Sequence, residues 1–80
     1  MTTEIIAFGI AKDIIGDRQL KLNLSDGTTV GSLKETICKR FPDFERLRSM
    51  AIAVNEEYQE DDFVIKAGDE VVIIPPVSGG

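Results

Sequence analysis

The sequence predicts an α+β fold in which one main helix packs across one mixed sheet. Three observations indicate this class: two segments of period-two alternation near the start, one helical pattern in the middle, and a continuous apolar run near the end. A chain of 80 residues has room for one domain. We expect residues 1–74 to form that domain and residues 75–80 to form a flexible C-terminal tail.

Two strands are expected before the helix. Residues 4–11 carry bulky side chains at 6, 8 and 10 and small ones at 7, 9 and 11, and residues 19–24 alternate polar residues with Leu. Residues 12–17 predict a short turn-like connection closed by Gly16. Asp26-Gly27 predicts a tight turn after the second strand. The two strands should therefore form an antiparallel hairpin with a long connection.

The main helix is expected to begin near Val30. Thr28 or Thr29 can cap its N-terminus, and Pro42 ends it, because the residue before proline is disfavoured in the helical region. Its apolar face is marked by residues at helical spacing: Val30, Leu33, Ile37, Cys38 and Phe41.

The second half of the chain predicts the rest of the sheet. Residues 43–49 should connect the helix to a strand at 50–54, with one helical turn around Phe44 and Leu47. Residues 55–57 predict a turn into a short strand at Tyr58, and residues 60–66 an acidic loop around Phe63, Val64 and Ile65. Residues 70–74 are expected to form the last strand, and the continuous apolar run that follows Glu70 is typical of a buried central strand.

Composition excludes several classes of function. The net charge is −5 and the nine Lys and Arg residues are scattered, which argues against nucleic-acid binding. No apolar run approaches the roughly 20 residues that span a bilayer, so no membrane interaction is expected. No basic segment precedes the first apolar stretch, as it would in a secretory signal, and we expect a cytoplasmic protein.

The chain is poor in residues for catalysis of its own. It has no His and a single Cys, so neither a zinc site nor a Cys–His or Ser–His pair can be assembled, and we expect no bound cofactor or metal. Cys38 could carry sulfur, but its place on the apolar helix face favours a structural role. Five acidic residues at 56, 57 and 60–62 lack the glycine and ligand spacing of a calcium loop, which favours a solvated loop.

The end of the sequence is the most informative segment. The last expected strand runs into Pro75 and Pro76, which stiffen an extended exit, and then into Val77, Ser78, Gly79 and Gly80. Two residues without Cβ atoms can thread a narrow channel, so the Gly80 carboxylate could enter another protein's active site. Gly-Gly alone does not distinguish this role from an inert end.

The segment GDEVVIIPPVSGG closely resembles the end of the small subunits of molybdopterin synthase, a family of sulfur carriers with the ubiquitin-like β-grasp fold. The segment KDIIG at 12–16 and the pair Val54-Asn55 are also similar to this family. Lys12 stands where the family often has Arg, which weakens any case for a bidentate contact there. The resemblance spans the chain and is most specific at the C-terminus.

The resemblance implies a role for Gly80, with Gly79 beside it. An adenylyltransferase similar to ubiquitin-activating proteins would use ATP to adenylate the Gly80 carboxylate, which then becomes a thiocarboxylate. The tail would enter the large synthase subunit and donate sulfur to the cyclic pterin precursor in molybdenum cofactor biosynthesis. The chain would then not be an enzyme by itself.

The resemblance also implies a surface for the large subunit. Besides the tail residues Pro75 to Ser78, it points to Phe8, Tyr58 and Ile74. Alternation alone leaves open whether these three are interface or ordinary core.

Other functions stay open at this point. The chain could carry sulfur for thiazole or tRNA thiolation, modify proteins as ubiquitin does, or bind partners with an inert tail. Thiazole carriers are typically shorter and lack a segment like 12–16, which favours the molybdopterin pathway.

Overall fold

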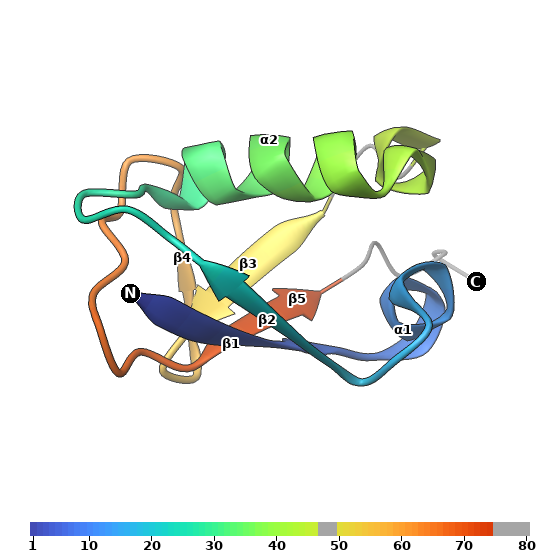
Figure 1. Ribbon diagram of the computed structural model, residues 1–80, viewed down its shortest axis with the longest axis horizontal. Helices are drawn as coiled ribbons and strands as arrows, with labels where there is room; N and C mark the ends of the chain where they lie inside the picture. Colours follow the sequence, from blue (N-terminus) through green and yellow to red (C-terminus); the bar gives the residue numbers. More distant parts are fainter. Residues whose placement is uncertain (47–49, 75–80) are drawn as a thin grey trace.

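The protein has two layers, a five-stranded mixed sheet and the main helix α2 (Val30–Arg40) across one face of it (Figure 1). The computed structural model describes residues 1–46 and 50–74. The strand order is β2-β1-β5-β3-β4, with one parallel pair, β1 with β5, among antiparallel ones. The predicted α+β class and mixed sheet are confirmed.

The strands lie close to the expected segments. They are β1 (Thr2–Ala7), β2 (Gln19–Asn23), β3 (Ala51–Val54), β4 (Glu57–Gln59) and β5 (Val71–Ile74). β1 and β2 form the predicted antiparallel hairpin. β5 lies between β1 and β3, which confirms that the continuous apolar run is a central strand.

Two tight turns form at the positions where the sequence predicts turns. After β2, the Thr28 N–H donates to the Ser25 carbonyl at 3.2 Å, with Gly27 at φ +86°. Between β3 and β4, Asn55 and Glu56 both have positive φ, 53° and 71°, which matches the right-handed twist of the strands they join.

Helix α2 begins and ends where expected. Thr29 is its N-cap, and its hydroxyl oxygen accepts from the Ser32 N–H at 3.1 Å. Arg40 is the last helical residue, before Phe41 and Pro42. The loop after β4 satisfies two more N–H groups of the first turn, since Val30 donates to the carbonyl of Phe63 at 2.9 Å, and Gly31 to that of Asp61 at 2.9 Å.

The connection between β1 and β2 corrects the expected strand. Residues 9–11 are not extended but begin helix α1 (Gly9–Ile15), and the predicted turn at 12–17 is mostly the rest of this helix. Gly9 at φ +54° turns the chain after Phe8, and Gly16 at φ +88° closes the helix by donating to the Lys12 carbonyl. The side chains of residues 4–11 alternate in size as those of a strand would. Residues 9–11 are nevertheless helical, and the helix places the Ala11 side chain against the core, where it is buried.

One hydrophobic core fills the space between α2 and the sheet. Alternate residues of the strands meet three residues of α2, and Phe44 of the 3₁₀ helix η1 (Pro42–Arg46) closes one end. The core consists of Ile5, Ala7, Ala11, Leu22, Leu24, Val30, Leu33, Ile37, Phe44, Ile52, Val54, Ile65, Val71 and Ile73. In the acidic loop, Ile65 is buried and Phe63 partly so, whereas Val64 is exposed.

Some expectations fall outside the described residues. Leu47 in the connector is one, and residues 75–80 are another, so the division into a domain at 1–74 and a tail stays a prediction. Within residues 1–46 and 50–74, no helix has the length and apolarity that crossing a membrane requires.

Candidate functional site

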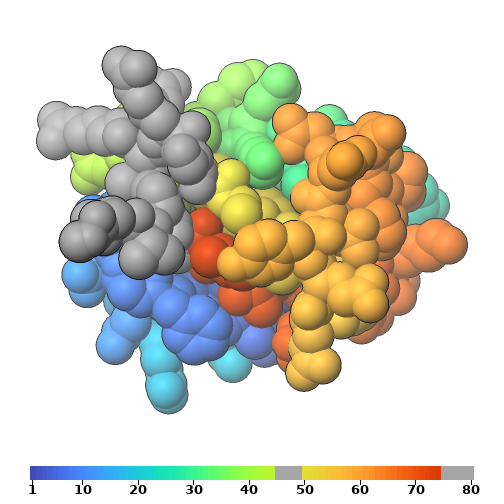
Figure 2. Space-filling view, turned by 180° about the vertical axis from the view of Figure 1, so that it is seen from behind, coloured from blue at the N-terminus to red at the C-terminus, as the bar shows by residue number. Residues whose placement is uncertain are grey.

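The sheet face opposite α2, which we call the open face, carries a continuous apolar row. Ile6, Val72, Ala53 and Tyr58 follow one another across β1, β5, β3 and β4 in register. These four lie outside the core cluster, whose members on the strands occupy alternate positions. Figure 2 shows atoms of β5, in red, at the surface between the blue N-terminal segment and the yellow to orange β3–β4 hairpin.

Phe8, Tyr58 and Ile74 all belong to this face. Phe8 is extended and continues β1 on the same side as Ile6, and the parallel register of β1 and β5 places it beside Ile74. Phe8 is 56% exposed and Tyr58 70% exposed, so the alternative that they are ordinary core is wrong. Ile74 is half-buried and pairs with Ala51 on β3.

The open face adjoins the point where the tail begins. Ile74 is the last residue of β5 and the last one described before the C-terminal segment. The predicted tail residues lie outside the described part of the chain: Pro75, Pro76, Val77, Ser78, Gly79 and Gly80. A partner that covered the open face would therefore also lie next to the start of the tail.

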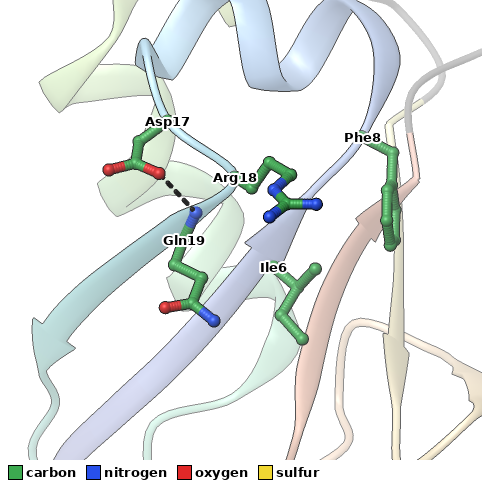
Figure 3. Close-up of a pocket in the computed structure, with 5 residues that line it drawn as sticks. All are labelled: Ile6, Phe8, Asp17, Arg18 and Gln19. Carbon is green, nitrogen blue, oxygen red and sulfur yellow. Dashed lines mark hydrogen bonds between the residues drawn. The ribbon is translucent and has the colours of Figure 1, made fainter.

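A hollow of about 390 Å³ lies at the β1–β2 margin of the open face (Figure 3). It is lined by Ile6, Phe8, Asp17, Arg18 and Gln19. Sequence reasoning missed Arg18, because one Arg in a connection carries no periodic signal. Ile6 could have been placed here, since it alternates with the buried residues of β1.

A cluster of side-chain hydrogen bonds fastens the other end of the sheet. The Asn55 amide donates to Asp69 Oδ1 at 3.0 Å, and its oxygen accepts from the Glu70 N–H at 3.0 Å. Asp69 Oδ2 accepts from the Lys66 N–H at 2.8 Å. These hydrogen bonds, first the one from Lys66 and then the one from Asn55, lower the pKa of the Asp69 carboxyl from its ordinary 3.8. The cluster links the turn after β3 to the start of β5.

Cys38 lies away from the open face. It is half-buried on α2 and packs against the core, in agreement with its predicted place on the apolar helix face.

The acidic loop is tied to α2 through one ion pair. Asp61 accepts from Lys34 Nζ at 2.7 Å. In the part of the chain that the structure describes, no three His, Cys, Asp or Glu side chains are grouped so as to hold a metal ion.

Comparison with known proteins identifies relatives along the whole chain. The profile described as "ThiS family" matches residues 5–80. A protein of Arabidopsis thaliana named molybdopterin synthase sulfur carrier subunit is 35% identical, over 96% of this chain and 81% of its own. One of the same name from Aedes aegypti is 37% identical, over 95% of this chain and 86% of its own.

Solved structures share the fold over the full length. SAMP1 from Haloferax volcanii is 25% identical with a TM-score of 0.83, and covers all of both chains. A putative molybdopterin converting factor subunit 1 from Pyrococcus furiosus is 28% identical with a TM-score of 0.84, over 96% of this chain and 99% of its own. A chain in a complex of subunits 1 and 2 of the molybdopterin-converting factor from Helicobacter pylori is 25% identical with a TM-score of 0.68, over all of both chains. These similarities confirm the predicted β-grasp fold.

Proposed function

This chain belongs to the ThiS family, and we propose from that membership that it is the sulfur carrier subunit of molybdopterin synthase. The observation that carries the proposal is full-length similarity, at 35% identity, to a relative of that name. The position of the open apolar face beside the end of β5 supports it, because a carrier must dock while its chain end enters another active site.

The reacting group in this proposal is the α-carboxylate of Gly80. A carboxylate is a poor acyl donor and must be activated. In the active site of an activating partner, the carboxylate attacks the α-phosphate of ATP, which forms an acyl-adenylate and releases pyrophosphate. Hydrosulfide, as the sulfur donor, then attacks the acyl carbon, the bond to AMP breaks, and loss of a proton leaves the thiocarboxylate. Gly79 and Gly80 present that group without side chains that could clash in a narrow channel.

The large subunit of the synthase is the proposed partner for the open face. Phe8, Tyr58 and Ile74 would be covered by it, and Pro75 to Ser78 would lead the Gly80 thiocarboxylate to the pterin precursor. Exposed aromatic side chains next to half-buried aliphatic ones are the composition of an interface core. The naming of a two-subunit complex for the Helicobacter pylori relative supports a partner of this kind.

The rest of the chemistry belongs to the partners in this proposal. The chain binds no cofactor of its own, and ATP is used by the adenylyltransferase. It acts as a carrier in the cytoplasm and is not an enzyme by itself. The absence of His from the sequence supports this division, because the commonest general base is missing.

Mass spectrometry of the C-terminal peptide tests the proposal. The protein is incubated with its candidate activating enzyme, ATP and a sulfur donor, with a reaction without ATP as the control. We expect a thiocarboxylate at Gly80 only when ATP is present. An isopeptide bond to a lysine would instead make the chain a protein modifier, and an unchanged carboxylate would make it a binding module.

A further inference from the structure

The hollow beside Arg18 opens directly onto the proposed docking surface. Ile6 and Phe8, which belong to the open face, form its apolar side, and Gln19 forms part of its rim. The Arg18 carbonyl accepts from the Ala7 N–H at 2.8 Å, which extends the β1–β2 ladder by one hydrogen bond and fixes the base of the arginine side chain. In Figure 3 the guanidinium is drawn above the Ile6 side chain and to the left of the Phe8 ring.

The guanidinium has no counter-charge within the described part of the chain. The ion pair found there joins Lys34 to Asp61, and none of the side-chain hydrogen bonds there involves the guanidinium of Arg18. The neighbouring carboxylate does not neutralise it, since Asp17 Oδ1 accepts from the Gln19 N–H at 3.4 Å and points away in Figure 3. Arg18 is exposed, so its guanidinium is accessible to water in the free protein.

Docking on the open face would change that hydration. A partner that covers Phe8 also removes water from the adjoining hollow, and the loss of water around an arginine that gains no acceptor is unfavourable. A carboxylate is the best replacement, because its two oxygens match the planar fork of the guanidinium.

We propose that the large subunit places an Asp or Glu side chain in the hollow against Arg18 when it covers the open face. This inference rests on the proposed function, which names that partner. The chain has a net charge of −5, so an acidic partner surface is not attracted from a distance. The contact therefore acts at short range, where it fixes the register of docking and slows dissociation.

Isothermal titration of the large subunit with four variants tests the contact. Arg18→Gln removes the charge, and Arg18→Glu reverses it. Lys39→Glu reverses an exposed charge on α2, behind the sheet, and is the matched control. Tyr58→Asp probes the open face away from the hollow. Thermal melts verify that each variant is folded.

We expect Kd to rise at least about tenfold for Arg18→Gln and about a hundredfold for Arg18→Glu, and to stay within about twofold for Lys39→Glu. A single Asp→Arg or Glu→Arg change on the large subunit should restore much of the binding of Arg18→Glu, and a double-mutant cycle identifies the pair.

The outcomes separate this inference from the proposed function. Wild-type affinity for both Arg18 variants, together with weakened Tyr58→Asp, overturns the carboxylate contact and leaves docking on the open face in place. Wild-type affinity for all of them overturns docking on that face as well. No binding by the wild-type protein overturns the partner itself and the contact with it.

Discussion

Asn55 and Asp69 hold one end of the sheet together although both lie near the surface. Each makes two side-chain hydrogen bonds of 2.8–3.0 Å. Asn55 also adopts the left-handed conformation, at φ 53°, which Asn tolerates better than most residues. A Val-Asn pair at 54–55 is thus explained by the turn and its hydrogen bonds.

The Asp69 hydrogen bonds predict a dependence of stability on pH. Because its pKa is lower in the folded protein than 3.8, the carboxylate contributes stability above that pH, and the contribution is lost as the pH falls through the folded pKa. Urea unfolding from pH 6 to pH 2.5 should show a smaller acid-induced loss for Asp69→Asn than for wild type. Asp62→Asn, an exposed control, should follow the wild type. Parallel curves for all three proteins would contradict this account.

The position of Cys38 predicts that its sulfur is not the one transferred. Cys38→Ser should keep full sulfur transfer and lose about 1 kcal/mol of unfolding free energy, because a hydroxyl replaces a thiol that packs against the core. A reconstituted molybdopterin assay and urea unfolding measure the two effects. Loss of transfer in a folded Cys38→Ser protein would make Cys38 a candidate carrier.

Among the secondary-structure elements, α2 covers the core, and its N-cap stabilises the start of this helix. Thr29→Ala should lower the free energy of unfolding by about 1 kcal/mol, because the Ser32 N–H loses its acceptor. Thr29→Ser keeps the hydroxyl and should retain most of the stability. Equal losses in the two variants, measured by urea unfolding, would show that the hydroxyl is not what matters.

The end of β5 is the element most directly connected with docking. Ile74→Asp should weaken binding to the large subunit at least about tenfold, since a charge would be buried in the interface. Val64→Asp, at an exposed apolar position outside the open face, is the control and should bind as wild type. Titration and a circular-dichroism melt decide between an interface and a folding defect. If the melt shows that Ile74→Asp is unfolded, or if the folded variant binds as wild type does, the result would argue against a place for Ile74 in the interface.

Sequence patterns predicted the elements well where one period dominates. Gln19 to Asn23 alternate cleanly, and α2 has both a cap and a proline stop, so both were placed correctly. Helix α1 was missed because Ala7, Gly9 and Ala11 alternate with bulky residues as a strand would. The helix starts at Gly9, whose positive φ is a property of the backbone, and the alternation of side-chain size does not indicate it.

The candidate site was predictable only in part. Phe8 and Tyr58 could have been core or surface, because alternation gives two faces without saying which one a helix covers. The register of five strands decides it, and register depends on contacts between distant segments. Arg18 becomes notable only beside Phe8 and Ile6, which the folded chain brings to it.

Across the whole molecule, as far as residues 1–46 and 50–74 show, the core cluster lies on one face of the sheet. Helix α2 and the core occupy one side, and the other carries the apolar row, in which Tyr58 is exposed, Ile6 and Val72 are half-buried and Ala53 is buried. A sheet with two apolar faces is completed by a third layer, which in this account the large subunit provides. In the proposed complex, the sheet would thus hold the end of β5, where the C-terminal segment starts, next to the large subunit.

In the proposed function the Gly80 carboxylate carries the sulfur, so changes in the length of that end of the chain should abolish sulfur transfer. Deleting Gly80 shortens the reach by about 3.5 Å, and adding one residue turns its carboxylate into an amide. A displacement of this size in a positioned active site costs on the order of a hundredfold or more in rate. The core residues that the structure describes end at Ile73, so we expect both variants to melt as wild type does.

The measurement is molybdopterin formation in a mixture of activating enzyme, ATP, sulfur donor, large subunit and pterin precursor. The wild-type thiocarboxylate must be located to the C-terminal peptide, because its mass change nearly equals oxidation of Met1 or Met50. We predict product from the wild-type protein and none above background from the deletion or the extension, although both still bind the large subunit. Normal product from either variant would contradict the claim that Gly80 bears the sulfur.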